Sequence, residues 1–220
     1  MKNNNTTPIN HFTNIDTTLS YLNENPTFVS GFTSGEGSFT GYIGVDTNLK
    51  WGIQPSCEFN LVQNSGDILL LQAISLFFKQ IALGFDLATK MSIDSVYDRL
   101  DGTHAFMVRN LADLNSIIIP FFIEHPLVGT KSYEFEKFVK IVELIISKKH
   151  VGSSLENRDA MVDLANLFKD LNLKAGSAGK RERLDIIINW LNSLSEVPSL
   201  AAKKELAADL ALFRRGRYNK

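Results

Sequence analysis

Residues 28–39 read Phe-Val-Ser-Gly-Phe-Thr-Ser-Gly-Glu-Gly-Ser-Phe, an apolar helical stretch that runs through Gly-Glu-Gly into an alternating strand. Asn25 and Pro26 precede it, which is typical of a helix start because proline loses no hydrogen bond at the first helical position. Glu36 would then stand at the helix C-terminus, where the peptide dipoles disfavour a carboxylate unless a cation lies beside it. The pattern indicates either a metal site at Glu36 or a solvated turn carboxylate.

The same helix carries small residues on one side. Gly31 and Gly35 are four residues apart and therefore share a helix face, with Ser30 and Ser34 nearby. A second helix backbone can approach such a bare face closely because no Cβ stands in its way. The alternative interpretation is a helix that is buried in its own domain and ended by a glycine.

Two stretches after this helix alternate between apolar and polar residues. Residues 38–46 and 51–62 follow the two-residue period of half-buried strands and predict a hairpin that turns near Thr47-Asn48. Pro55 lacks the N–H that a strand ladder needs, which favours a sheet edge or a bulge at that point.

The remainder of the chain is mainly helical in pattern. Residues 66–80 predict an apolar helix. The turn Asp101-Gly102 precedes a strand from Thr103 to Arg109, whose partner is either 84–90 or 93–99. A helical pattern begins at residue 110 with breaks at Pro120 and Pro126, and further helices are expected near 132–148, 155–172, 181–195 and 199–214.

The run from Val29 to Gly37, Val-Ser-Gly-Phe-Thr-Ser-Gly-Glu-Gly, resembles the LAGLIDADG motif of homing endonucleases and RNA maturases. Other segments resemble later parts of the family in the expected order, so that the resemblance spans residues 27–172. It implies an α+β fold of the LAGLIDADG homing-endonuclease type, in which helix, two strands, helix, two strands and helix form a saddle. The later segments are 58–63 in the second strand and 118–122, 126–131 and 135–138 in the helices and loop that follow.

This resemblance implies a division of the chain into three segments. We expect an N-terminal arm over residues 1–24, an endonuclease-like domain over 25–175 and a helical, basic C-terminal extension over 176–220. The sequence contains one copy of the motif and no second Gly-x-x-x-Gly-Glu-Gly.

A single motif has a consequence for assembly. Family members place two acidic residues from paired motif helices across the scissile phosphates, so a one-motif chain must pair with itself. The resemblance therefore implies a twofold homodimer with a self-complementary interface. Its interface would contain Gly31, Gly35, Ser30 and Ser34 of the 27–36 helix.

The resemblance also implies a catalytic site. Glu36 and the Gly35 carbonyl match the ligands of a divalent cation, Mg²⁺, which suits phosphodiester hydrolysis. Gln63 matches a residue that organises water around the metal, and Lys131 matches the basic residue that assists charge stabilisation. Without the motif, Gln63 is an ordinary strand-end residue and Lys131 a solvated lysine. Ser34 replaces the first acidic residue of the motif, which implies the loss of a polar contact at the helix end.

The predicted nucleic-acid-facing hairpins carry few cations. Lys50 is the only basic residue between residues 38 and 63, where Gln54 adds an uncharged polar contact, and Lys90 and Arg99 lie in the second pair of strands. Arginine and lysine supply most phosphate affinity and most guanine contacts, so this face is poorly supplied with charge for duplex binding.

Positive charge is concentrated near the other end of the sequence. Residues 148–220 hold 14 of the 23 lysines and arginines but 9 of the 24 acidic residues. This excess indicates either a nucleic-acid or rRNA contact or a solvated helix face with a frayed tail. The candidate contacts are Lys180, Arg181, Arg214, Arg215 and Arg217.

Several other classes of protein do not fit the sequence. The longest apolar runs, such as Ile68–Leu71, are too short to span a bilayer, and the N-terminus shows no import signal. Cys57 is the single cysteine, so it forms no internal disulfide and is expected in the core. Gly176–Lys180 has glycines too close together for a phosphate-binding loop, and the four histidines lack metal-ligand spacing.

Two functions from different classes follow from the sequence. The first is a homing endonuclease that makes a metal-dependent double-strand cut in duplex DNA, encoded in a mitochondrion or another organelle. Glu36, Gln63 and Lys131 favour it. The second is a scaffold of the same family that binds structured RNA without cutting, as an RNA maturase or a component of an organellar ribonucleoprotein such as the mitoribosome. The acidic hairpins and the basic tail favour this alternative.

Overall fold

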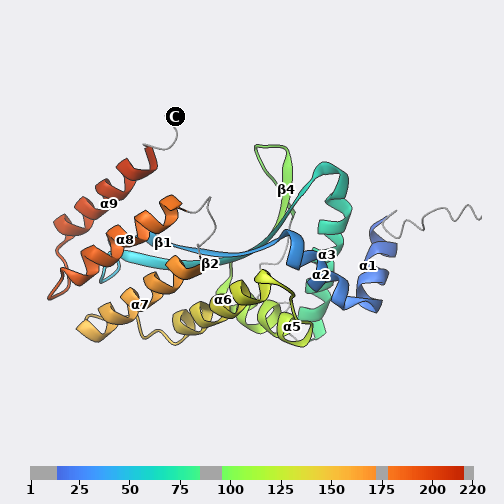
Figure 1. Ribbon diagram of the computed structural model, residues 1–220, viewed down its shortest axis with the longest axis horizontal. Coiled ribbons are helices and arrows are strands. Elements are labelled where there is room, and N and C mark those ends of the chain that lie inside the picture. The colour runs from blue at the N-terminus through green and yellow to red at the C-terminus, as the bar shows by residue number, and fades with distance from the viewer. Residues whose placement is uncertain (1–13, 85–95, 172–177, 216–220) are drawn as a thin grey trace, which may run out of the picture. The chain divides into compact units, whose positions relative to one another are not determined.

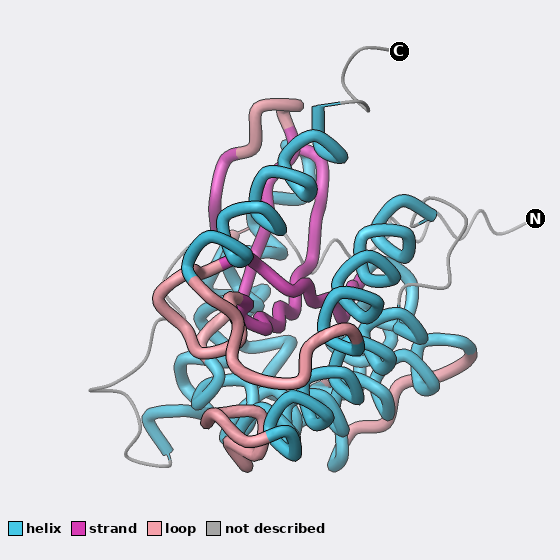
Figure 2. The backbone as a smooth tube through the Cα atoms, turned by 90° about the vertical axis from the view of Figure 1, so that its left-hand side faces the viewer, coloured by secondary structure: helices cyan, strands magenta, loops and turns pink. Residues whose placement is uncertain are grey.

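The computed structural model describes residues 14–84, 96–171 and 178–215 (Figure 1). Its backbone contacts divide it into two compact units. The first contains the described residues up to Ser38 together with Phe59–Ser132, and the second contains Phe39–Glu58 and the described residues from Tyr133 onward. Helices make up most of the described backbone, drawn in cyan in Figure 2 beside the magenta strands.

Within residues 14–84, 96–171 and 178–215, four strands form one antiparallel sheet in the order β1-β2-β4-β3. Strand β1 (Gly37–Val45) and strand β2 (Ile53–Asn64) form the predicted hairpin and pass from one unit into the other. The predicted alternation is confirmed, because Phe39, Ile43, Ile53 and Cys57 are all at least 98% buried. Burial also raises the pKa of the Cys57 thiol to about 12.

The register of the sheet explains the proline in β2. Strand β4 (Thr103–Val108) pairs with Phe59–Asn64 of β2, so that Pro55 lies outside the segment that needs ladder donors on that side. Strand β3 (Val96–Asp98) pairs with β4 across the turn at Asp101-Gly102. This pairing confirms the second of the two predicted partners as far as the structure describes it; residues 85–95 lie outside the described residues.

One predicted helix break is wrong. The chain stays helical through Pro120, from α4 (Leu111–Asp113) through a π-helical turn, η3 (Leu114–Ile118), into α5 (Ile119–Glu124). Proline removes an intrahelical donor and crowds the preceding turn. The wider π-helical turn just before Pro120 absorbs that crowding, which no local pattern predicts. The helical path does end before Pro126, as predicted.

The first unit also contains a helix within the predicted N-terminal arm. Helix α1 (Ile15–Glu24) is capped by Asn14, whose side chain accepts the Thr17 amide hydrogen at 2.9 Å. Leu22 and Thr18 of α1 are fully buried, and the Asn23 side chain donates to the Gln80 side chain at 3.0 Å. The segment is therefore packed structure in its described part.

Helix α3 (Ile68–Gly84) follows a 3₁₀ turn, η1 (Ser65–Asp67). The helical stretch Ser65–Gly84 is long and apolar enough to cross a membrane, so the prediction that no stretch is long enough is wrong by that criterion. Leu71, Ile74 and Phe78 of this helix are fully buried in the first unit. A core helix needs the same composition, and these contacts account for it.

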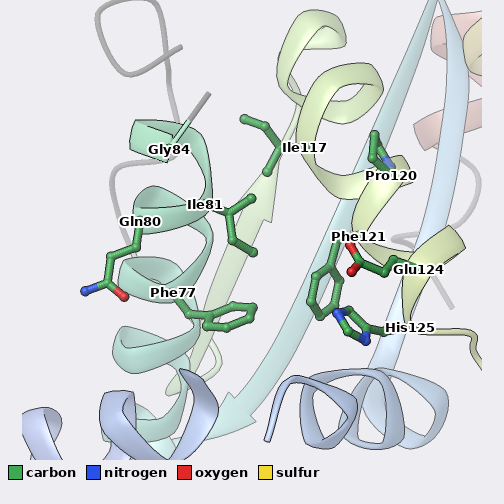
Figure 3. Close-up of a pocket in the computed structure, with 9 residues that line it drawn as sticks. All are labelled: Phe77, Gln80, Ile81, Gly84, Ile117, Pro120, Phe121, Glu124 and His125. Atoms are coloured by element: carbon green, nitrogen blue, oxygen red, sulfur yellow. The ribbon is translucent and has the colours of Figure 1, made fainter. Parts of the chain in front are cut away.

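Aromatic side chains dominate the core of the first unit. Phe78 of α3 lies with its ring centroid 5.8 Å from Phe106 of β4 and 5.1 Å from Phe121 of α5. Between α3 and α5 lies a mainly apolar hollow of about 380 Å³, into which Phe77 and Phe121 point and at whose edge Glu124 and His125 lie (Figure 3).

In its described part, the second unit holds the turn of the hairpin, three whole helices and a fourth from Tyr133 onward. Phe39 of β1 packs on Phe138 with ring centroids 5.2 Å apart, and a Cβ at Gly41 would lie 2.1 Å from the Phe168 ring. Because Gly41 has no side chain, the helix that carries Phe168 can pack close to β1. Lys169 of α7 (Leu155–Leu171) forms an ion pair with Asp185 of α8 (Ala178–Asn192) at 2.5 Å. The helices are α6 (Thr130–Ile146), α7 (Leu155–Leu171), α8 (Ala178–Asn192) and α9 (Leu200–Arg215).

Candidate active site and nucleic-acid interface

The helix that carries the motif is α2, Pro26–Glu36. Asn25 lies at its N-cap, but the Asn25 side chain donates to the Tyr21 carbonyl at 3.0 Å and makes no capping bond. Gly37 ends the helix by donating its N–H to the Thr33 carbonyl. A Cβ at Gly37 would lie 2.6 Å from that carbonyl oxygen, so only glycine fits this close turn into β1. Glu36 is exposed as the last helical residue.

The glycine face of α2 is open toward the part of the chain that the structure describes. Gly31 and Gly35 are exposed, and a Cβ built on either would have no neighbour within 4 Å. Ser30 does not belong to this face, because its side chain is 3% exposed and donates to the His125 carbonyl at 2.6 Å. The prediction of Ser30 as a surface contact is therefore wrong, since its hydroxyl already holds a segment of its own unit.

Ser34 also makes an internal contact. Its hydroxyl donates to the Ser30 carbonyl at 2.7 Å and accepts the Val128 N–H at 3.1 Å. The expected loss of a polar contact at this position is therefore wrong, because the shorter serine side chain supplies one. The bond joins the C-terminal turn of α2 to the segment that leads into α6.

Gln63 lies next to the end of β2 and is half-buried. It faces His104 of β4 across the sheet. In an antiparallel hairpin the last residues of the second strand lie beside the first residues of the first strand. Gln63 is thus brought to the end of the hairpin at which Glu36 stands, immediately before β1.

Lys131 is the second residue of α6 and is only 4% exposed. The interpretation as an ordinary solvated lysine is therefore wrong. Gly129, with φ of 65°, turns the chain into this helix, and Val128 is bonded to Ser34. Since Lys131 follows Val128 by three residues, the segments of Glu36, Gln63 and Lys131 all meet near the C-terminal end of α2, within the first unit.

His104 is a neighbour of this site that sequence reasoning missed. Its Nδ1 lies 2.8 Å from Asp98 Oδ1, and its Nε2 lies 3.2 Å from Ser65 Oγ. Asp98 and Gln63 both face His104 in the strand register. The sequence alone does not predict that Gln63, His104 and Asp98 lie side by side, because the pairing of separate strands determines it.

The candidate nucleic-acid contacts differ in how they are placed. Lys50, Gln54 and Lys180 are exposed, and Arg181 is half-buried. Arg99 is exposed in the β3–β4 turn, 3.7 Å from Asp101. The Thr103 hydroxyl, which donates to Asp101 at 2.6 Å, lowers the pKa of that carboxyl below its usual value. Arg214 and Arg215 belong to the last turn of α9, whereas Lys90 and Arg217 lie outside the described residues.

Two cations of the basic C-terminal segment hold the hairpin within the second unit. Arg183 donates to the Ile43 carbonyl at 3.1 Å. Lys203 is 8% exposed and donates to the Leu49 carbonyl at 2.7 Å. The helical spacing of Lys203, Leu206 and Leu210 was the available signal, because it places the lysine on the buried stripe of α9.

The described residues contain no cluster of three or more histidine, cysteine, aspartate or glutamate side chains that could enclose a metal ion. A cation at Glu36 would therefore have few protein ligands among the described residues. Mg²⁺ keeps several waters and is commonly held by one or two carboxylates together with phosphate oxygens. The donor set of Glu36 and the Gly35 carbonyl fits a cation that is shared with a nucleic-acid phosphate.

Comparison with known proteins decides the family. The model of the LAGLIDADG endonuclease family matches residues 29–142, from the motif helix into α6. The chain belongs to the LAGLIDADG endonuclease family. The α+β fold expected from the resemblance is thereby confirmed, with the antiparallel sheet described above.

Similar proteins include a probable intron-encoded endonuclease 2 of Neurospora crassa, which is 31% identical over 80% of this chain and 37% of its own length. This LAGLIDADG chain therefore spans little more than a third of that relative. The homing endonuclease I-TnaI has a TM-score of 0.61 and 24% identity over 76% of this chain and 97% of its own. The I-LtrWI LAGLIDADG homing endonuclease, bound to target DNA, has a TM-score of 0.57 and 28% identity over 74% of this chain and 49% of its own.

Proposed function

We propose that this chain is a homing endonuclease that makes a divalent-cation-dependent double-strand cut in duplex DNA. The observation that carries the proposal is the exposed Glu36 at the end of α2, beside a glycine face that no described residue of the first unit fills. The relative from Neurospora crassa is described as intron-encoded, and I-LtrWI is bound to target DNA. Both support DNA as the substrate.

We propose a catalytic role for each residue of this site. Glu36 and the Gly35 carbonyl would hold Mg²⁺, which activates water and stabilises charge on the phosphate when bound. Gln63, at the neighbouring end of β2, would orient a water through its amide. Lys131 would place a buried positive charge near the phosphate, where low polarity strengthens its effect.

We further propose that a second copy of this chain completes the site. A double-strand cut needs a carboxylate on each strand, and this sequence supplies one motif. The chain matches nearly all of I-TnaI but about half of I-LtrWI, which supports one motif domain pairing with another. Gly31 and Gly35 are the residues that would meet the second α2.

We place the origin of the chain in an intron of a mitochondrial or other organellar genome, on the description of its relative as intron-encoded. The RNA-binding alternative is less favoured, since Arg183 and Lys203 of the basic segment bind backbone carbonyls of their own unit.

The test is cleavage of a plasmid that carries the uninterrupted sequence flanking the intron insertion site, with and without Mg²⁺. We expect linear product only with the cation and only from that plasmid. Binding to this site without any cutting, in Mg²⁺ or Mn²⁺, would contradict the endonuclease function and return the RNA-binding scaffold as the better interpretation.

A further inference from the structure

The outer face of the sheet in the first unit is set by the strand register. Phe59 and Leu61 of β2 and Phe106 of β4 are fully buried on the inner face. Successive strand residues point to opposite faces, so the residues between them face outward. On β2 these are Asn60, Val62 and Asn64, and on β4 they are Thr103, Ala105 and Met107. Asn64 is exposed, Ala105 at the centre is only 1% exposed, and the other four are half-buried.

Cross-strand pairing arranges these side chains in three rows. Asn60 pairs with Met107, Val62 with Ala105, and Asn64 with Thr103. Tyr97 of β3 extends the middle row, because it pairs with Ala105. The middle row is thus mainly apolar, and an amide side chain stands in each flanking row.

The polar groups on this face are not equivalent. Asn64 is exposed and makes no capping bond to the helical turn that follows it. The Thr103 hydroxyl is already engaged, because it donates to Asp101 at 2.6 Å. Among the described residues of the first unit, charged side chains flank this face, with Arg99 and Asp101 in the β3–β4 turn and Arg109 after the end of β4.

This set of groups selects among base pairs. In the major groove, asparagine pairs in bidentate fashion with adenine N6 and N7, and apolar groups contact the thymine methyl. Guanine is read mainly by arginine or lysine, and cytosine N4 by aspartate or glutamate. None of the outward residues of β2 from Asn60 to Asn64, or of β4, carries a charge. A two-stranded ribbon such as β2–β4 fits into the major groove.

We propose that the outer face of β2–β4–β3 reads A·T base pairs in the major groove of the target, with Asn64 on an adenine and Val62 and Met107 against thymine methyls. This inference rests on the proposed function, because it names the sequence class of the same duplex substrate. The marginal arginines contact phosphates and set the register without selecting a base.

The test is selection of bound duplexes from a randomised DNA pool by the full chain, followed by sequencing. We expect a run of consecutive positions enriched in A·T in each half-site. Asn64→Ala should reduce the preference for adenine at one position by about 5- to 100-fold, the range for one bidentate contact. Met107→Arg should add a preference for guanine near that run.

Asn115→Ala is the matched control, because Asn115 is an exposed asparagine of the same unit that lies outside the sheet. It should leave the selected sequence unchanged. Enrichment of G·C pairs across the whole half-site, or an unchanged selection with Asn64→Ala, would overturn the inference while leaving duplex binding intact. A chain that enriches no duplex at all would overturn the proposed function and the inference with it.

Discussion

Two regions of this protein stand out in its sequence, the glycine-rich helix α2 and the basic helices α8 and α9, and the structure treats them differently. The unusual residues of α2, Gly31, Gly35 and Glu36, are exposed, and a Cβ on either glycine would meet no described residue within 4 Å. Two cations of the basic helices, Arg183 and Lys203, instead bind carbonyls of the hairpin. For Arg183 and Lys203 the charge that stands out in the sequence serves contacts within the fold, whereas we propose the exposed residues of α2 as the binding surface.

The largest effect is expected at the end of α2. Glu36→Gln should abolish Mg²⁺-dependent cutting of the target plasmid, because it removes the charge that holds the cation, while target binding in a gel-shift assay persists. Glu24→Gln is the matched control, since Glu24 is likewise the exposed last residue of a helix. Equal cutting by both variants would refute the assignment of Glu36.

Large side chains on the glycine face of α2 should prevent the chain from forming a dimer. Gly31→Leu combined with Gly35→Leu should convert a dimer into monomers in light scattering, with thermal unfolding little changed, because both positions open onto free space. Gly66→Leu, at another exposed glycine with open space, serves as the control. A monomeric unmodified chain, with and without DNA, would show that the α2 face has a different role.

Replacing a buried cation of the basic helices should lower the stability of the protein. Lys203→Met leaves the Leu49 and Thr47 carbonyls without their buried donor and should lower the free energy of unfolding by about 1–3 kcal/mol in urea titrations. Lys204 is the next residue and is exposed, so Lys204→Met should have little effect on the free energy of unfolding. If Lys203→Met instead weakens DNA binding and leaves the free energy of unfolding unchanged, the assignment of a structural role to this lysine is wrong.

A smaller loss is expected where α2 is tied to the segment before α6. Ser34→Ala leaves the Val128 N–H without its acceptor and should cost about 1 kcal/mol of unfolding free energy. Cutting should slow as well, since Lys131 follows this segment. Ser20→Ala, at an exposed serine of α1, is the comparison variant. Full activity and stability of Ser34→Ala would show that the bond positions nothing.

The smallest effect is expected from a single surface cation. Lys50→Ala should reduce the slope of log affinity against log salt by about 0.9 if Lys50 contacts one phosphate of duplex DNA. Removal of residues 213–220 should reduce the slope further, since it deletes Arg214, Arg215 and Arg217. An unchanged slope after the truncation would assign DNA contact to the hairpin cations and remove the tail from the interface.

The sequence by itself determined the local structure and the family of this protein. The helix from Pro26, the alternation of the β1–β2 hairpin and the order of the LAGLIDADG segments are set by neighbouring residues, so periodicity and motif spacing were enough to predict them. Glu36 was predicted for the same reason, since its position at a helix end is a local property.

Only the tertiary structure decided what each polar side chain contacts. Ser30 and Gly31 are adjacent in sequence, yet one is buried against the His125 carbonyl and the other is exposed. The partner of β4, the placement of His104 beside Gln63 and the burial of Lys131 likewise depend on segments far apart in the chain. Long-range packing fixes these contacts, because a hydrogen bond or a buried charge needs a partner that the local sequence does not supply.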